Sequence, residues 1–236
     1  MFLASLMRLP RRCLSRAIRD VTSAYLSLRS ARLTGFVTEK GSNARICVTD
    51  PFLPVTIKMG KGASFVLRGK LTFDSWAGSR QRVHIELGAG SNLTIAGDFS
   101  LGNGCRIVVI EGGKLYIGGR LKESGSGITE KSMILVRRCV TIGTDFICSW
   151  GVFITDCDWH ETIGACSTED TVIGDHVWIT PNCSILKGSR IGNGCIIATG
   201  AVTHRASYGD RCLLGGIPAR ALAQDREWTR DLKPLE

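Results

Sequence analysis

Isoleucine recurs every six residues between residues 172 and 202, where the chain reads VIGDHVWITPNCSILKGSRIGNGCIIATGAV. The recurring positions are Ile173, Ile179, Ile185, Ile191 and Ile197. Four residues after each of them stands a small or β-branched residue, namely Val177, Cys183, Ser189, Cys195 and Ala201. Helices and strands have periods of 3.6 and 2 residues, so neither explains this pattern. The six-residue unit, or hexad, predicts a three-sided solenoid in which isoleucine points to the axis and the small residue fills a corner.

A looser repeat precedes the hexads, from residue 57 to residue 143. Four segments of similar pattern begin at Met59, Leu87, Val109 and Ile134. Each contains two apolar residues separated by one position: Phe65/Leu67, Leu93/Ile95, Leu115/Ile117 and Val140/Ile142. We expect these segments to form earlier coils of the same solenoid, with loops at their corners. Regular hexads span residues 136–202, interrupted by a polar insert at residues 161–172.

The two ends of the chain differ from this solenoid, which we assign to residues 35–216. Residues 1–34 lack glycine and space their apolar side chains as on a helix, so they predict a basic amphipathic arm that ends at Gly35. This arm either caps the solenoid or rests on an anionic membrane surface, and a transit peptide has the same composition. Residues 217–236 predict a short helical cap that begins at Pro218.

Charge and cysteine content narrow the class of protein. The net charge is +9, but residues 1–34 hold seven arginines against one acid, so the charge belongs to the arm and predicts no nucleic-acid binding. Cys183 and Cys195 occupy small inward positions, and Cys105 and Cys148 fit similar ones, so the ten cysteines are expected to be reduced. Without a secretory signal or an apolar run of about 18 residues, we expect a cytoplasmic protein, with the arm as its contact with the inner face of the membrane.

The hexad rhythm stops at the sequence ITDCDWHE, where Asp156, Asp158 and His160 are spaced by two. On an extended strand these three side chains would face the same side. An imidazole beside carboxylates suits a general base, because a carboxylate orients the ring and stabilises its protonated form. The spacing alone is also compatible with an ordinary surface histidine that has no catalytic role.

Several motifs together resemble one enzyme family. They are the hexads at 136–202, the D-C-D-W-H segment and the loop after it, the V-I-G-D-H-V-W-I unit at 172–179, and G-G-I-P-A-R at 215–220. The chain resembles the left-handed β-helix acyltransferases, and among them the maltose, galactoside and surface-polysaccharide O-acetyltransferases. The resemblance implies an all-β solenoid, a left-handed parallel β-helix, and a homotrimer with active sites between subunits.

The resemblance also assigns roles to individual residues. His160 would take the proton from an acceptor hydroxyl, which then attacks the thioester of acetyl-CoA without a covalent enzyme intermediate. The acceptor would be a sugar, such as a cell-surface polysaccharide or its precursor, and Trp150 and Trp159 either line its site or pack against a neighbouring subunit. The residues implied at the cofactor are Trp178, Thr199, Arg205, Arg220 and Lys187. Arg205 stands where relatives often have a basic residue, although the sequence here is T-H-R-A and theirs is often T-K-D. Lys187 replaces a common proline, and both residues are compatible with polyphosphate binding.

Other functions remain open from the sequence. A non-catalytic β-helix scaffold would use the same hexads, and an N-acetyltransferase on an amino sugar or amino acid would use the same histidine. The γ-type carbonic anhydrase shares the fold, but it needs three zinc-binding histidines, and the four here (His84, His160, His176 and His204) lack the spacing of its paired ligands. We therefore expect no metal. A Cys157–His160 nucleophile is disfavoured, because residues three apart face opposite sides of a strand.

Overall fold

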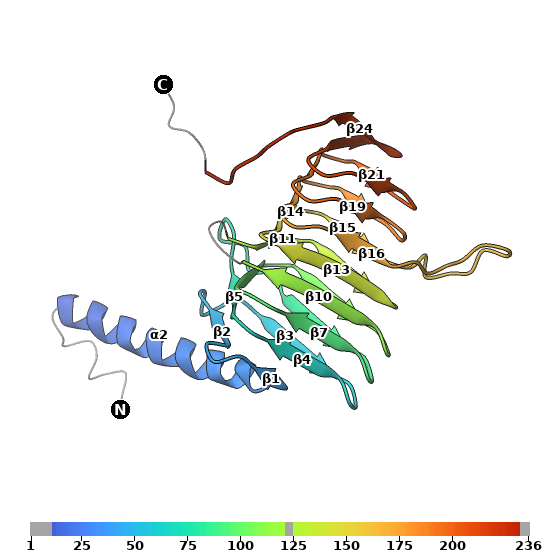
Figure 1. Cartoon of the computed structure of the whole chain (residues 1–236). Coiled ribbons are helices and arrows are strands. Elements are labelled where there is room, and N and C mark those ends of the chain that lie inside the picture. The colour runs from blue at the N-terminus through green and yellow to red at the C-terminus, as the bar shows by residue number, and fades with distance from the viewer. Residues whose placement is uncertain (1–10, 121–124, 232–236) are drawn as a thin grey trace, which may run out of the picture.

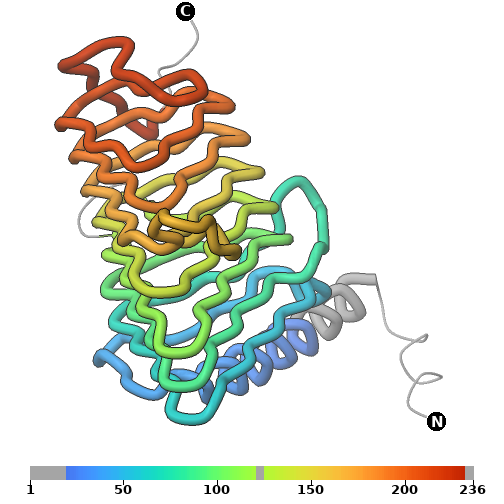
Figure 2. The backbone as a smooth tube through the Cα atoms, turned by 90° about the vertical axis from the view of Figure 1, so that its right-hand side faces the viewer, coloured from blue at the N-terminus to red at the C-terminus, as the bar shows by residue number. Residues whose placement is uncertain are grey.

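The structure is a computed structural model of the chain and describes residues 11–120 and 125–231, with side chains from residue 20 onward. Within these ranges the chain forms one helix, α2 (Arg11–Thr34), followed by short strands that wind into a three-sided parallel β-helix (Figures 1 and 2). Each coil contributes one strand to each of three sheets, which we call faces A, B and C in the order in which the chain enters them.

The strands of each face lie parallel to one another and follow the order of the coils. Face A holds β1 (Glu39–Lys40), β4 (Ser64–Leu67), β7 (Asn92–Ile95), β10 (Lys114–Gly119), β13 (Cys139–Thr144), β16 (Thr171–Ile173), β19 (Arg190–Ile191) and β22 (Ser207–Tyr208). Face B holds β2 (Arg45–Val48), β5 (Lys70–Asp74), β8 (Phe99–Gly102), β11 (Gly127–Glu130), β14 (Ile147–Trp150), β17 (Trp178–Ile179), β20 (Ile196–Ile197), β23 (Leu213–Gly216) and the antiparallel β24 (Ala219–Ala223). Face C holds β3 (Val55–Met59), β6 (Val83–Leu87), β9 (Arg106–Val109), β12 (Met133–Val136), β15 (Phe153–Thr155), β18 (Ser184–Ile185) and β21 (Val202–Thr203).

The hexad residues point into the solenoid as predicted. The recurring isoleucines are 0–3% exposed: Ile173, Ile179, Ile185, Ile191 and Ile197. Their small partners are fully buried: Val177, Cys183, Ser189, Cys195 and Ala201. Equivalent residues stack directly, as Ile173 does on Ile191, because the parallel ladder keeps the coils in register. Burial of one isoleucine side chain contributes about 1.5–3 kcal/mol, so the stack of inward side chains is the main source of stability.

The looser repeat forms the earlier coils of face A, which confirms that prediction. Phe65 pairs with Leu93, Leu93 with Leu115, and Leu115 with Val140, so the four aligned segments are neighbours in one sheet. These side chains are 0–1% exposed. The coils differ in length only because loops of different size leave their corners, which preserves the register of the core.

Helix α2 covers the first turn of the solenoid. Its last turn packs Leu33 into the core, while Thr34 and Ser30 accept hydrogen bonds from the edge amides of Ile46 and Val48, at 3.0 and 3.2 Å. The helix ends before Gly35, as predicted, where the Gly35 amide bonds back to the carbonyl of Ala31. Covering an edge strand in this way prevents it from pairing with another chain. Nothing in the described part of the chain is both helical and apolar over the length that a membrane crossing requires.

The predicted C-terminal helical cap at residues 217–236 is wrong for the described residues up to 231. After Gly216 the chain turns back, and β24 pairs antiparallel with β23, with Gly216 opposite Ala219. The last coil leaves a row of unpaired amide and carbonyl groups on β23, and a returning strand satisfies them where a helix could not. This tertiary demand overrides the helix propensity of the sequence ARALA.

All nine cysteines whose side chains are described are free, as the hexad positions of Cys183 and Cys195 predict. Burial raises the pKa of Cys105 to about 11, and burial also raises the pKa of Cys148 well above its ordinary value. Cys166, in the loop after β15, is exposed. The inward cysteines therefore act as small apolar residues with little thiolate.

Thiol alkylation tests this arrangement. With iodoacetamide at mildly alkaline pH, we expect Cys166 to be modified rapidly in the native protein, and Cys105, Cys148, Cys183 and Cys195 only after unfolding in guanidinium chloride. Peptide mass spectrometry reads each site. Rapid native labelling of Cys183 or Cys195 would contradict the stacked core.

Candidate functional site

The hexad rhythm breaks at the corner between faces C and A, directly after β15. The Asp156 side chain is fully buried there, and its carboxylate accepts hydrogen bonds from three successive backbone amides of the coil below: Arg137 at 2.8 Å, Arg138 at 2.7 Å and Cys139 at 2.7 Å. A carboxylate that accepts three hydrogen bonds from backbone amides has used most of its acceptor sites. The predicted contact between Asp156 and the imidazole is therefore not formed within one chain, and Asp156 instead holds the turn.

Asp158 is held by a buried lysine. The Lys187 side chain is 3% exposed, and its ammonium forms an ion pair with Asp158 and donates to the carbonyl of Cys166 at 2.6 Å. A buried charge is tolerated only when it is paired and hydrogen-bonded, and these two contacts provide both. This placement corrects the prediction that Lys187 faces the phosphates of a cofactor. Lys187 ties the start of the loop, at Asp158, to its far side at Cys166.

His160 begins the exposed part of this loop. The chain leaves the strand geometry after Thr155, so the predicted alignment of Asp156, Asp158 and His160 on one strand face is not formed. The His160 side chain is exposed, and no hydrogen bond or ion pair connects it to any other described residue. Its ring is thus available to a group from outside the chain.

The predicted insert at residues 161–172 is shorter by two residues, because Thr171 and Val172 already belong to β16. Its base is a narrow ladder: the Asp158 amide donates to Ser167 at 2.9 Å, and the Glu169 amide donates to Asp156 at 2.9 Å. Figure 1 shows the tip projecting away from the stack of coils. The loop therefore has a fixed base, at His160, and an extended tip.

Cys157 and Trp159 face the base of the loop. The Cys157 sulfur is buried, and it accepts hydrogen bonds from the Trp159 amide at 3.2 Å and the Thr168 hydroxyl at 3.4 Å. The Trp159 indole donates to the Thr155 hydroxyl at 3.2 Å, and its ring is half-buried. Cys157 makes no hydrogen bond to His160, so the geometry gives no support to a Cys–His nucleophile.

The residues implied at the cofactor fall into two groups. Arg205 lies with Lys187 at the corner between faces C and A, where its guanidinium pairs with Glu169 and lowers the pKa of that carboxyl below its ordinary value. Trp178 and Arg220 lie on face B, on β17 and β24, and exposed Thr199 follows β20 at the corner between faces B and C. One chain therefore separates the two groups onto different sides of the solenoid.

Trp228, which no sequence pattern singled out, organises the C-terminal segment. Trp228 stacks on His176 with ring centroids 4.0 Å apart and an interplanar angle of 4°, and it lies 5.9 Å from the ring of Trp178. The Trp228 indole also donates to the His176 carbonyl at 3.0 Å. Nothing in the spacing of these residues, 52 positions apart, signals the pairing. It fixes the segment after β24 against face B.

Trp150 ends β14 on face B, away from Trp159. Its side chain is 45% exposed, and its carbonyl accepts the Asn182 amide at 3.0 Å. The two tryptophans proposed to line an acceptor site are thus at different corners of the same chain. In the described residues, no group of three His, Cys, Asp or Glu side chains is arranged to hold a metal ion.

Residues 170–205 match the family model for bacterial transferase hexapeptide repeats, in six repeats. The chain carries these transferase repeats. The matched residues include β16 to β21, the coils directly after the loop that carries His160. The solved structure of the polySia-specific acetyltransferase NeuO has the same fold, with a TM-score of 0.50 at 20% identity, over 76% of this chain and 91% of that chain. The predicted left-handed parallel β-helix is confirmed.

Two relatives are similar in sequence over part of their length. The "Putative lipopolysaccharide biosynthesis O-acetyl transferase WbbJ" of Escherichia coli (strain K12) is 28% identical over 105 residues, which is 39% of this chain and 53% of that protein. The "Putative acetyltransferase YvoF" of Bacillus subtilis (strain 168) is 31% identical over 97 residues, which is 40% of this chain and 53% of that protein. The chain spans about half the length of these curated relatives. The resemblance to hexapeptide-repeat acyltransferases is confirmed.

An Asp156→Asn variant tests the structural role of this carboxylate. The amide would place an NH₂ group against backbone amides that now donate to oxygen, so we expect the free energy of unfolding to fall by about 2–4 kcal/mol. Urea denaturation followed by circular dichroism measures it. Asp170→Asn, at a partly exposed surface ion pair, is the control and should change stability by less than about 1 kcal/mol. Equal stability of the two variants would contradict the assignment.

A Lys187→Met variant tests the link across the loop. Methionine keeps the buried stem but removes both contacts to Asp158 and Cys166, so amide hydrogens of residues 158–169 should exchange faster with solvent. Hydrogen–deuterium exchange read by mass spectrometry reports this directly. Lys131→Met, which removes an exposed lysine paired with Glu130, should leave the loop unchanged. Unaltered exchange in Lys187→Met would show that the ion pair does not hold the loop.

Proposed function

We propose that the chain is an acetyl-CoA-dependent O-acetyltransferase that acts on a hydroxyl of a sugar, in a cell-surface polysaccharide or its precursor. The observation that carries the proposal is the exposed imidazole of His160, which has no hydrogen-bond partner among the described residues and stands directly before coils that match transferase hexapeptide repeats. The named activities of the relatives support the reaction type, and the lipopolysaccharide biosynthesis named for WbbJ supports a surface glycan as acceptor.

His160 is the proposed general base. A ring nitrogen takes the proton of the acceptor hydroxyl as its oxygen attacks the acetyl carbonyl carbon of the thioester. The carbon–sulfur bond then breaks, the ester remains on the acceptor, and the thiolate of CoA takes the proton back from the imidazolium. Asp156 and Asp158 contribute indirectly in this scheme, because they fix the turn and the loop base from which the ring projects.

The donor site is proposed to form between two copies of the chain. The implied cofactor residues lie on two sides of one solenoid: Arg205 at the corner near His160, and Trp178, Thr199 and Arg220 on or beside face B. A molecule as long as acetyl-CoA can contact both groups if the corner of one subunit lies beside face B of the next. This geometry supports the homotrimer with active sites between subunits, in which Arg220 meets the phosphates.

The N-terminal arm supports a site near a membrane surface. α2 turns Val21, Tyr25 and Leu28 to solvent, at 51–73% exposure, on the side away from the residues that pack on the first coil. Positions four and three apart form one stripe on a helix, so these side chains present a continuous apolar face. The arginines at positions 8–19 lie in the part of the arm whose side chains are outside the described residues. We propose peripheral contact of this arm with the inner face of the membrane.

Replacement of His160 by alanine tests the proposal. We expect acetyl transfer, followed as free thiol released from acetyl-CoA, to fall about 10²–10⁴-fold, because the proton is no longer removed in the transition state. Affinity for acetyl-CoA, measured by calorimetry, should be unchanged. His84→Ala is the matched control, since His84 pairs with Glu86 on face C and is far along the stack from the loop. Near-normal transfer by His160→Ala would refute the assignment.

A further inference from the structure

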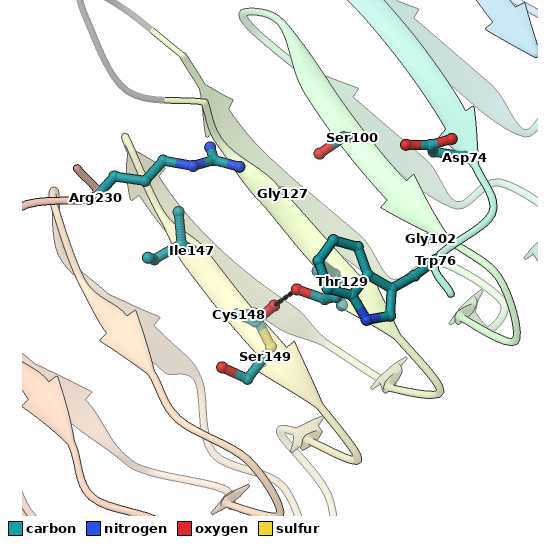
Figure 3. Close-up of a pocket in the computed structure, with 11 residues that line it drawn as sticks. Asp74, Trp76, Ser100, Gly102, Gly127, Thr129, Ile147, Cys148, Ser149 and Arg230 are labelled. Atoms are coloured by element: carbon teal, nitrogen blue, oxygen red, sulfur yellow. Dashed lines mark hydrogen bonds between the residues drawn. The ribbon is translucent and has the colours of Figure 1, made fainter. Parts of the chain in front are cut away.

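Face B carries a groove on the coils that precede the hexads matching the transferase model, and its last strand, β14, pairs with β17 of those hexads. It lies over strands β5, β8, β11 and β14 and has a volume of roughly 300 Å³. Its lining comes from strand residues, from the loop after β5, and from the C-terminal segment, as Figure 3 shows. Segments more than 150 positions apart in sequence, at Asp74–Trp76 and at Arg230, thus border one groove.

Two glycines form part of the floor of the groove. A Cβ atom on Gly102 would lie 1.5 Å from the carbonyl oxygen of Thr129, and one on Gly127 would lie 2.0 Å from the hydroxyl oxygen of Ser100. Neither position therefore accepts a side chain, and both φ angles are ordinary, so close approach and not backbone conformation demands glycine. Close packing between neighbouring coils therefore requires glycine at both positions, and neither adds a side chain to the floor of the groove.

Trp76 forms one side of the groove, and a hydrogen bond to a buried residue holds its backbone. Its side chain is 55% exposed, but its backbone amide donates to the side-chain oxygen of Asn103 at 2.6 Å. Asn103 is fully buried, and its amide group donates to Glu130 at 3.0 Å. An exposed indole on an anchored loop binds a ligand with little loss of conformational freedom.

Polar groups line the floor of the groove and the side on which Trp76 lies. One oxygen of Asp74 accepts the Thr49 hydroxyl and the Ser75 amide, which fixes the carboxylate, and the other oxygen has no partner among the described residues. Ser100, Thr129 and Ser149 place hydroxyl groups along the floor. A carboxylate and hydroxyls beside an aromatic ring suit sugar hydroxyls, with the apolar face of the sugar against the ring.

Arg230 forms the opposite side. Figure 3 shows its guanidinium extending over the strands toward the groove, across from Trp76. No carboxylate in the described parts of the chain lies within ion-pairing distance of it. A second hollow of roughly 170 Å³ continues from Arg230 and is lined by two more basic residues, Lys70 and Arg120, with Asp98. Basic side chains therefore follow the groove in one direction, and an anionic ligand would satisfy Arg230.

We propose that this groove binds a segment of an acidic saccharide chain, with a sugar ring against Trp76, sugar hydroxyls at Asp74, and a carboxylate or phosphate at Arg230. The groove lies on face B, whereas His160 lies at the corner between faces C and A, so the bound segment is not the reacting sugar of the same chain. It holds the acceptor polymer at a second position. The inference rests on the proposed function only for the role of the saccharide as acceptor, since binding is measurable without transfer.

Calorimetry on the full chain tests the site with three probes: an oligogalacturonate, a phosphorylated mannooligosaccharide and neutral maltohexaose. We expect the acidic probes to bind more tightly than maltohexaose, and the stronger of the two identifies the anionic group. Trp76→Ala should weaken that binding at least about tenfold, and Trp76→Phe less. Arg230→Ala should remove the preference for acidic over neutral chains, and Arg230→Lys should keep part of it. Tyr116→Ala on face A and Arg106→Ala on face C are matched controls and should bind as the parent does.

Three results would overturn the site. The first is equal affinity for acidic and neutral chains. The second is binding of acidic chains that survives in both Trp76→Ala and Arg230→Ala. The third is no saccharide binding together with a change of oligomeric state in Trp76→Ala, which would make the groove a subunit contact. Analytical ultracentrifugation of each variant provides the last comparison. His160→Ala separates this inference from the proposed function: it should bind the acidic probe normally, whether or not the chain transfers acetyl groups.

Discussion

Register between coils is the constraint on which the whole structure depends. Each inward side chain packs on its equivalent one coil away, as Ile179 does on Ile197, so a coil can change length only at its corners. Insertions therefore leave the core intact and accumulate outside it, in the loop after β15 and the loop after β5. Each of the two candidate binding regions of this chain includes such a corner insertion, placed on a scaffold whose faces fix its position.

Polar contacts then fix the backbone path of the corner insertions. At the loop after β15, Asp156 binds three amides of the coil below, and Lys187 bridges Asp158 to the far side of the loop. At the loop after β5, Asn103 holds the amide of Trp76. In each case a buried polar side chain from a neighbouring coil determines the path of an exposed segment. Among the described residues every buried side-chain polar group has a hydrogen-bond partner, and the side chains proposed to act, His160 and Trp76, are left exposed.

The sequence predicted the features that the six-residue period controls, and it predicted few of the contacts between segments outside that repeat. Inward positions, the stacking of the looser repeats and the break at His160 follow from apolar spacing, because the core dictates them. The burial of Lys187, the stack of Trp228 on His176 and the strand at Ala219–Ala223 do not, because each depends on a surface that exists only after the coils assemble. The spacing of Asp156 and Asp158 was informative about location and misleading about role, since the strand ends at Thr155.

The proposed chemical step at His160 lies apart from the proposed recognition of the acceptor chain on face B. Steady-state kinetics on one acidic oligosaccharide acceptor, with saturating acetyl-CoA, test this separation most directly. Trp76→Ala should raise the KM for the acceptor about tenfold with kcat within about twofold of the parent, while His160→Ala should lower kcat by orders of magnitude with little change in KM. If both variants lowered kcat by the same factor and left KM unchanged, recognition and chemistry would belong to one site, and the account would be contradicted.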